Sequence, residues 1–210
     1  GFNKTLNQYR IKKLKAQWQG KSCLELGAGY GHITEALVKR FRNLVVVEPD
    51  PECFGNILDK VEKYCCKIEE FEHDKKFDTI ICSNVLEHVD NPIEVLKKIS
   101  NFGHKNTKYI FIVPNAISYN RLSGVDMGIL THSSQLSERD IEAGHKRMYY
   151  PASFKEDIET VGYEITHCET YLYKPFHNAY MVRLPKKVVD HCFNMKMKDN
   201  GAEIMAVCKI

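Results

Sequence analysis

The sequence predicts an α/β fold, in which a parallel sheet carries helices on both faces. Two observations predict it: short runs of continuous apolar residues, and segments of roughly 10–14 residues with helical spacing between them. The chain has 210 residues, of which 43% are hydrophobic, so it can bury the core of one domain. We expect a single domain over residues 1–210, with an N-terminal helix within 1–20 and a covering insertion over 115–150.

The first part of the chain alternates helices and strands. Residues 4–19 space their apolar side chains as an amphipathic helix does. SCLEL (22–26) is predicted as a strand and HITEALVKRF (32–41) as a helix that ends in basic residues. The β-branched run NLVVVE (43–48) predicts a second strand, and PECFGNILDKVEKY (51–64) a second helix of this alternation.

The same alternation continues to residue 114. YCCKI (64–68) predicts a short strand and FDTIICS (77–83) a stronger one. NPIEVLKKIS (91–100) predicts a helix with Pro92 in its first turn, where the missing N–H costs nothing. KYIFIVP (108–114) is apolar throughout and predicts a buried strand.

After Pro114 the alternation breaks. Residues 115–150 are polar and contain glycine, yet their aromatic and apolar side chains favour an ordered cover with short helices. SFKEDIETVGY (153–163) predicts a helix with a capping box formed by Ser153 and Glu156 and a stop at Gly162.

Two alternating runs close the chain. YEITHCETYLYK (163–174) and AEIMAVCKI (202–210) predict strands that pair antiparallel at the edge of the sheet. The segment between them, residues 175–201, is predicted to hold an inserted helix.

Charge and cysteine placement exclude several classes of protein. The net charge is only +3 and basic residues are interleaved with acidic ones, which argues against a nucleic-acid partner. The eight cysteines form no C-x-x-C pair and no zinc-finger spacing, so we expect reduced thiols in a cytoplasmic protein. No apolar run of about 18 residues and no basic-then-apolar leader occurs, so no membrane association is predicted. A homodimer is one oligomeric state that the sequence leaves open.

Three glycines stand where the first strand gives way to a helix. Gly27, Gly29 and Gly31 allow a tight turn, a close approach of a ligand to the backbone, and N–H groups that face it. A dinucleotide site requires G-x-G-x-x-G, but position 32 is His32, which counts against NAD. Glu48, at the end of the second strand, can hold two ribose hydroxyls with either kind of cofactor.

Four stretches together resemble class I S-adenosylmethionine-dependent methyltransferases: ELGAGYGHIT, VVVEPDP, FDTIICSNVLEHVDNPIEVLKKI and GHKRMYYPASFKEDIETVGYE. The resemblance is to the branch of ubiquinone-type and sugar or small-metabolite methyltransferases, and it covers about residues 20–175 in the family's order. It implies a Rossmann-like sheet of seven strands, mostly parallel with an antiparallel last strand. It also implies S-adenosyl-L-methionine as cofactor and S-adenosyl-L-homocysteine as its product.

Carried over by motif position, the resemblance implies ten cofactor-binding residues: Glu25, Gly27, Ala28, Gly29, Glu48, Pro49, Ile68, Glu69, Ser83 and Asn84. The first four are expected to line the methionine and ribose portions, and Glu48 to accept from the ribose hydroxyls. Pro49 and Asp50 are expected to border the adenine. Ile68 and Glu69, which follow the third strand, are expected to flank it. Ser83 and Asn84 are expected to face the methionyl amino group. The family often has Asp or Asn after strand three, where this chain has KIEEF.

Two histidines are candidate general bases. His145 and His88 have ordinary pKa values near 6.5, so either can accept a proton from a hydroxyl acceptor. The alternatives are that His88 braces the loop after the fourth strand and that His145 is a solvated loop residue. Glu87 and His132 could join these histidines around a metal, but none of the four has i,i+4 ligand spacing, so no metal is predicted.

A basic segment suggests an anionic acceptor. GHKR contains Lys146 and Arg147, and Arg121 and Arg139 lie in the same cover. The predicted substrate-binding residues are Asn115, Arg121, Lys146 and Arg147. The hypothesis is that the acceptor carries a phosphate or carboxylate. A solvated loop explains the same charges.

The sequence therefore predicts an enzyme that transfers a methyl group to a small metabolite by O-methylation of a hydroxyl, with a sugar, phosphorylated or polysaccharide precursor as acceptor. The alternatives are N-methylation of a small amine, a non-catalytic cofactor-binding regulator, and an NAD-dependent oxidoreductase. The acceptor itself and the atom methylated are not named by the sequence.

Overall fold

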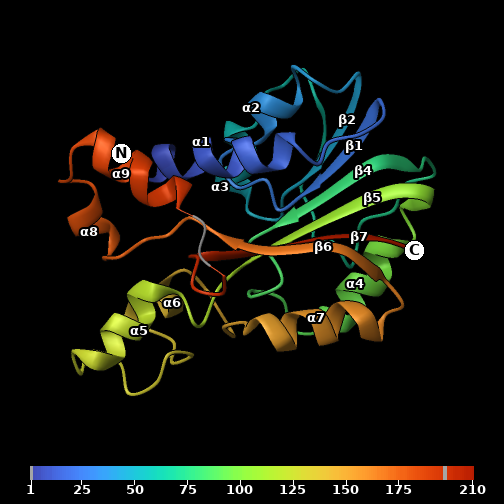
Figure 1. Ribbon diagram of the computed structural model, residues 1–210. Helices are drawn as coiled ribbons and strands as arrows, with labels where there is room; N and C mark the ends of the chain where they lie inside the picture. The colour runs from blue at the N-terminus through green and yellow to red at the C-terminus, as the bar shows by residue number, and fades with distance from the viewer. Residues whose placement is uncertain (1, 196–197) are drawn as a thin grey trace.

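The computed structural model describes residues 2–195 and 198–210 and contains a seven-stranded sheet with the order β3-β2-β1-β4-β5-β7-β6 (Figure 1). The first five strands are parallel, and β7 runs antiparallel to both β5 and β6. The predicted methyltransferase-like sheet is therefore confirmed. The strands are β1 (Ser22–Leu26), β2 (Asn43–Val47), β3 (Glu62–Tyr64), β4 (Phe77–Ser83), β5 (Gly103–Pro114), β6 (Glu164–Tyr171) and β7 (Glu203–Lys209).

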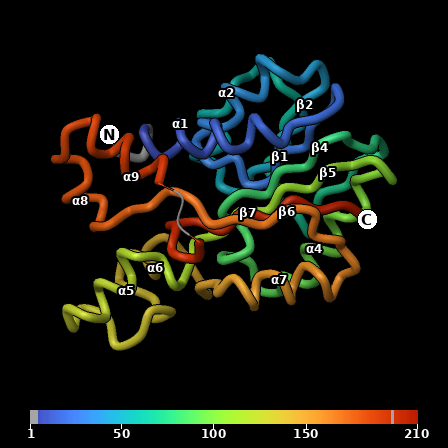
Figure 2. Tube along the Cα trace, viewed as in Figure 1, coloured from blue at the N-terminus to red at the C-terminus, as the bar shows by residue number. Residues whose placement is uncertain are grey.

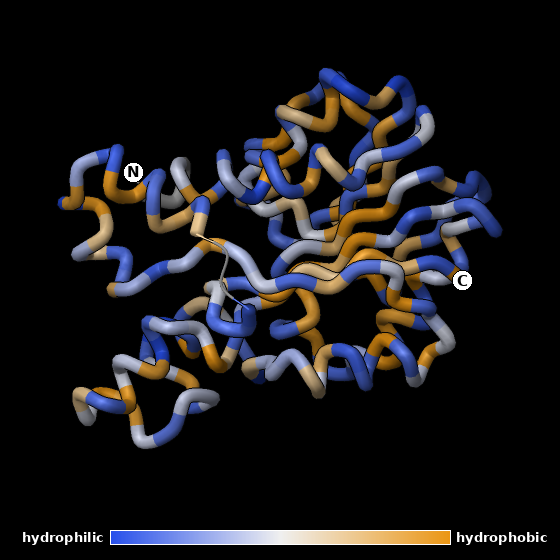
Figure 3. Tube along the Cα trace, viewed as in Figure 1, coloured by the Kyte–Doolittle hydropathy of each residue, from blue (hydrophilic) through white to orange (hydrophobic). Residues whose placement is uncertain are grey.

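Helices cover both faces of the sheet (Figure 1). On one face, Leu96 and Phe154 of α4 (Pro92–Ser100) and α7 (Pro151–Thr160) pack in one core cluster. On the other, Leu14 and Leu37 of α1 (Phe2–Lys15) and α2 (Thr34–Leu37) pack in a second cluster with Phe193 of α9 (Lys186–Asn194). Apolar residues follow the central strands, and the outer loops are hydrophilic (Figure 3). Continuous apolar strands form here because both of their faces are buried.

The predicted helix over 51–64 is wrong beyond its first turns. Helix α3 spans Pro51–Asn56, because Ile57 takes an extended conformation and its side chain is buried. The following residues then form β3, which pairs with β2, so the short strand lies at 62–64 instead of 64–68. The helix α2 is likewise only the middle of the predicted segment 32–41.

The start of α7 also differs from the prediction. The helix begins at Pro151, its N-cap is Tyr150, and Ser153 is the third helical residue. Ser153 Oγ accepts from the Tyr150 backbone N–H at 3.2 Å, so Ser153 is not the cap and Glu156 takes no part in a capping box. The helix ends before Gly162, whose φ is +93°, as predicted.

The later segments agree with the predictions. The cover contains α5 (Tyr119–Asp126) and α6 (Glu138–Glu142), and the insertion before the last strand contains α8 (Asn178–Met181) and α9. Strands β6 and β7 pair antiparallel, although β7 lies inside the sheet and only β6 at its edge. All eight cysteines are free thiols.

The carboxyl ends of the parallel strands meet at one edge of the sheet, beside the cover (Figure 2). Because β7 is antiparallel, its first residue reaches the same edge: Glu203 is in register with Pro114 of β5 and Tyr171 of β6. Ligands of open α/β sheets bind at this edge. No helix within the described part of the chain is both long and apolar enough to cross a membrane.

Candidate functional site

A cavity of about 460 Å³ lies beside the glycine loop at the carboxyl edge of the sheet. It receives residues from the ends of β1, β2 and β4 and from the cover. Its lining includes these predicted cofactor-binding residues: Gly27, Gly29, Glu48, Pro49, Ile68, Glu69 and Asn84. Three others, Glu25, Ala28 and Ser83, do not line it.

The glycine loop approaches this cavity with backbone conformations that other residues rarely adopt. The φ angles of Gly27, Gly29 and Gly31 are +72°, +53° and +74°. A Cβ at Gly27 would lie 2.2 Å from Val85 Cγ2, whereas a Cβ at Gly29 would meet no atom within 4 Å. Gly27 is therefore required by packing, and Gly29 leaves open space at the wall of the cavity.

Glu48 is fixed beside the glycine loop by the backbone. One carboxylate oxygen accepts from the Gly29 N–H at 2.7 Å and the other from the Asp50 N–H at 3.0 Å, and only 6% of the residue is exposed. A carboxylate has about four acceptor sites, so Glu48 can still accept from the hydroxyls of a ribose. This geometry fits the role that the resemblance implies.

Glu25 lies behind the loop instead of in the cavity. It accepts from the Thr34 hydroxyl at 2.6 Å, and its other carboxylate oxygen has no partner within the described residues. Burial raises the pKa of Glu25 to about 8. The structure thus gives Glu25 a contact with the start of α2, and direct contact with a cofactor remains a prediction.

Sequence reasoning missed several residues that line the cavity: Cys53, Lys67, Val85, Val89, Asp90 and Ala143. Val85 and Val89 belong to the VLEHV stretch, which could have pointed to them. Ala143 comes from the cover, and no signal in the sequence indicates that it reaches the glycine loop.

Polar groups without partners gather where β4 ends. They are Ser83 Oγ, Asn84 Oδ1, both carboxylate oxygens of Glu87 and His145 Nδ1, all buried atoms without a hydrogen-bond partner among the described residues. Asn84 also has a φ of +56°, which is uncommon for a residue other than glycine and typical of functional sites. Buried polar groups normally have partners, so this cluster suits a polar ligand.

The structure brings the two candidate bases together. The rings of His88 and His145 meet edge to face with centroids 4.7 Å apart, and burial lowers the pKa of both. Ligand atoms of Glu87, His88 and His145 lie within 4.8 Å of one another, although the sequence spacing did not predict a cluster. His132 is not part of it; this exposed histidine contacts Ser134 Oγ instead. His145 Nδ1 lies 3.6 Å from Asp140 Oδ1, which opposes the lowering of its pKa.

Burial also changes the charge of Glu87. The side chain is fully buried, and this raises its pKa to about 8, with nearby Glu203 acting in the same direction. At neutral pH the carboxyl group therefore holds a proton and can donate one hydrogen bond.

All four predicted substrate-binding residues have structural partners, and those of Asn115 and Arg121 lie within the cover and the last loop. Asn115 donates to the carbonyls of Asp199 and Gly201, both at 2.8 Å. Arg121 donates to Asp140 at 3.0 Å and to two carbonyls of the cover. Their contact with an acceptor stays a prediction that this geometry does not favour.

Arg147 and Lys146 differ although they are neighbours. Arg147 donates to the backbone carbonyls of Leu86, Val89 and Asp90, so it holds the loop after β4 in place. Lys146 pairs with the exposed Asp90 carboxylate and lines the cofactor cavity. Lys146 therefore places a cationic group at the wall of the cofactor cavity, whereas the guanidinium group of Arg147 is bonded to backbone carbonyls and does not line the cavity.

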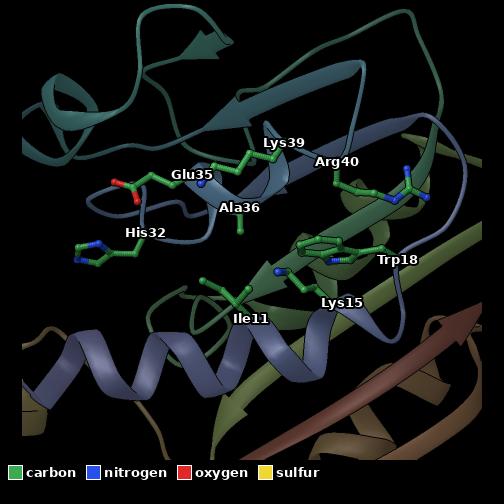
Figure 4. A pocket seen from close by; sticks show the side chains of 8 residues that line it. All are labelled: Ile11, Lys15, Trp18, His32, Glu35, Ala36, Lys39 and Arg40. Carbon is green, nitrogen blue, oxygen red and sulfur yellow. The ribbon is translucent and has the colours of Figure 1, made fainter.

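A second hollow of about 540 Å³ lies between α1 and α2 (Figure 4). Ile11, Lys15 and Trp18 line it from the N-terminal segment, and it shares no lining residue with the cavity beside the glycine loop. It receives none of the unpaired groups at the end of β4. We therefore assign the cofactor to the cavity at the carboxyl edge.

Comparison with known proteins agrees with this geometry. A family described as a methyltransferase domain matches residues 3–168. Among solved structures, a SAM-dependent methyltransferase from Archaeoglobus fulgidus superposes with a TM-score of 0.69 at 17% identity, covering 99% of this chain and 94% of that one. A SAM-dependent methyltransferase and possible histamine N-methyltransferase from Thermotoga maritima gives 0.71 at 16% identity, covering 97% and 88%. At these identities the likeness shows the fold.

The curated relatives match over shorter stretches. A ubiquinone biosynthesis O-methyltransferase of Rickettsia bellii is 32% identical over 98 residues, or 42% of this chain and 41% of the relative. N-methyltransferase 4 of Papaver somniferum is 28% identical over 111 residues, or 45% and 30%. An uncharacterized protein of Mycobacterium tuberculosis is 29% identical over 109 residues, or 47% and 37%. The match spans less than half the length of each of these relatives.

Proposed function

The chain belongs to the family of methyltransferase domains, and from this premise we propose that it methylates a hydroxyl group of a small metabolite with S-adenosylmethionine. The predictions of the family, the fold class and the cofactor are confirmed. One observation carries the proposal for the acceptor: His88 lines the cavity beside the glycine loop and forms a half-buried pair with His145, next to a Glu87 carboxyl group that has no hydrogen-bond partner among the described residues.

The residues present fit the cofactor. Gly29 leaves space at the wall of the cavity, Glu48 has free acceptor sites for ribose hydroxyls, and Asn84 Oδ1 has no partner among the described residues. Bound there, S-adenosylmethionine supplies a methyl group activated by its sulfonium. The protein then contributes by holding the acceptor in line with that group and by excluding water.

The proton of the acceptor hydroxyl needs a base. Because burial lowers the pKa of His88 and His145, both rings are neutral at physiological pH and can accept a proton. The Asp140 carboxylate, 3.6 Å from His145 Nδ1, stabilises the imidazolium that forms. This asymmetry favours His145 as the base. The protonated Glu87 carboxyl can donate a hydrogen bond to the acceptor and so orient it.

N-methylation of a small amine is the second candidate, supported by the name of the Papaver relative. The two candidates differ in their need for a base, since an amine loses its proton more readily than an alcohol. A strict dependence of turnover on His145 supports the hydroxyl, and independence from it supports the amine.

The test combines binding with turnover. Calorimetry is expected to show binding of S-adenosylhomocysteine and none of NAD, and methyl-labelled S-adenosylmethionine is expected to label hydroxyl compounds in a panel of sugars, phenols and amines. Label in amines alone would support the second candidate. Binding of S-adenosylhomocysteine without label in any compound would support a regulatory role, and binding of NAD in its place would overturn the proposal.

A further inference from the structure

Lys174 lies in the segment that follows β6. It is half-buried, and its ammonium group donates to Asn178 Oδ1, a neutral acceptor, at 3.0 Å. No ion pair of the described residues includes it, although Glu203 and Asp140 attract its charge from farther away. A partly buried cation without a close counter-ion is stabilised by a ligand of opposite charge.

Arg139 of α6 meets the same segment from the cover. Its Nη1 lies 3.2 Å from Nε2 of His177, which caps α8, and this contact includes no acid. Burial lowers the pKa of Lys174 to about 8; Glu203 opposes this shift, and Arg139 and Arg121 add to it. Burial also lowers the pKa of His177, and Lys174 and Arg139 add to that shift. The positive groups are therefore near enough to repel one another.

The acids nearby are already paired. Glu203 accepts from both Arg10 and the Tyr171 hydroxyl. Asp140 accepts from Arg121 and from Ser137. Both carboxylates attract Lys174, but Glu203 is shared with Arg10 and Asp140 with Arg121, so these cations together with Arg139 outnumber the two acids.

This group lies on the edge of the sheet that holds the cofactor cavity. The last residue of β6, Tyr171, is in register with Glu203, which is in register with Pro114 at the end of β5. Leu172 then takes a φ of +61°, which redirects the chain toward α8. In Figure 1 the segment from β6 to α8 runs out on the side of the cover. Strand β6 is three strands from β4, or about 14 Å at the usual spacing.

We propose that Lys174 and Arg139 form an anion subsite that holds a carboxylate or phosphate group of the methyl acceptor. The inference rests on the proposed function, since it assigns the anion to the molecule that is methylated. It moves the hypothesis of an anionic acceptor from Arg121 and Arg147, whose donors are used, to two cations that form no ion pair within the described residues. The subsite holds one end of the acceptor while the other reaches the histidine pair at the end of β4.

The test uses inorganic phosphate and acetate as probes, measured by calorimetry at constant ionic strength with chloride as reference. Wild-type protein is expected to bind one or both saturably, and the stronger probe distinguishes a phosphate from a carboxylate site. Lys174→Met and Arg139→Gln are each expected to weaken binding by at least about tenfold, as expected for a charged hydrogen bond. Lys187→Met removes an exposed lysine of α9 and is expected to leave the affinity unchanged.

The outcomes separate this inference from the proposed function. Each preparation is also titrated with S-adenosylhomocysteine. If that ligand binds while neither phosphate nor acetate does, or if Lys174→Met binds the probes as tightly as wild type, the subsite is overturned and the methyltransferase proposal stands. If the probes bind but S-adenosylhomocysteine does not, the assignment to an acceptor fails. Arg139 is exposed, so Arg139→Gln folds even if Lys174→Met does not.

Discussion

The two halves of the sheet's carboxyl edge are built in different ways. The cofactor half, above β1, β2 and β4, shapes its cavity with backbone: three glycines at positive φ, and Glu48 held by two N–H groups. The other half, above β5, β7 and β6, which we propose as the acceptor half, depends on side chains that meet across long stretches of chain. Arg10 pairs with Glu203, and Arg139 contacts His177.

This difference explains why membership of the family indicates the cofactor but does not identify the acceptor. A backbone turn that needs positive φ accepts few residues, so its chemistry is tied to the fold. Side chains on a cover can be exchanged while the sheet stays the same, and a fold does not determine its substrate. Perturbing one half should therefore leave the other half intact, and the predictions below test this separation.

The largest effect is expected from His145→Asn. Removing the proposed general base is expected to lower kcat by about 10²–10⁴-fold, while the affinity for S-adenosylhomocysteine stays unchanged because His145 does not line the cofactor cavity. Steady-state kinetics and calorimetry measure the two quantities. His132→Asn, in the same cover but exposed, is the control and should retain full turnover. Full turnover in His145→Asn as well would remove it from the mechanism and leave His88 as the candidate.

The contrast also shows what could be predicted from the sequence. The turn at Gly27 and Gly29 is local, because a strand, the glycines and a helix follow one another within a few residues. The contact between His88 and His145 is not a local feature, because it depends on how the cover packs against the loop after β4. The partners of Arg121 could not be predicted for the same reason, because the sequence does not show which loop carbonyls will accept from its guanidinium group. Without those partners, Arg121 was a candidate for binding substrate.

Tertiary contacts also overrode one local pattern. Ile57 and Val61 are spaced four apart, which is compatible with the helix predicted over 51–64. Both side chains are buried, but they belong to a bend and turn that lead into β3 and its pairing with β2. A helix and a turn that packs against the sheet would both bury Ile57 and Val61, so the spacing of these residues does not distinguish the two structures.

Gly27→Ala is expected to affect stability and cofactor binding together. The added methyl group clashes with Val85 at a φ that disfavours alanine, which costs about 2–4 kcal/mol of the free energy of unfolding. Gly128→Ala is the control: it has a φ of +69° and no neighbour within 4 Å, so it costs only the conformational part, about 1–2 kcal/mol. Denaturant unfolding measures the free energy of unfolding of both variants, and calorimetry with S-adenosylhomocysteine measures their cofactor binding. Equal losses would show that the contact with Val85 relaxes freely.

Glu87 lies where the two halves meet, and its titration gives a dependence on pH. Its pKa rises from 4.5 to about 8 on folding, so the folded state binds the proton more tightly. Its contribution to stability is then full below pH 4.5 and is lost between about pH 4.5 and 8, by about 1 kcal/mol per pH unit. Glu87→Gln stays neutral and is expected to lose this slope in unfolding measured from pH 5 to 8.

The same group provides a test for metal. No metal was predicted at Glu87, His88 and His145, and a protonated Glu87 is a poor ligand. Turnover is therefore expected to be unchanged after dialysis against EDTA. Loss of turnover that zinc, manganese or magnesium restores would show that the cluster binds a cation and that Glu87 is ionised in the working enzyme.

The smallest effect is expected at Lys146, which comes from the cover but lines the cofactor cavity. Its ion pair with Asp90 is exposed, so Lys146→Met should change the free energy of unfolding by less than about 1 kcal/mol. Arg147→Met should cost about 2–3 kcal/mol, because the carbonyls of Leu86 and Val89 lose their donor. If the affinity for S-adenosylhomocysteine falls more than about tenfold in Lys146→Met, the cover contributes directly to cofactor binding. Lys146 would then belong to both halves of the sheet edge. Cofactor binding would be independent of the cover only at the glycine loop.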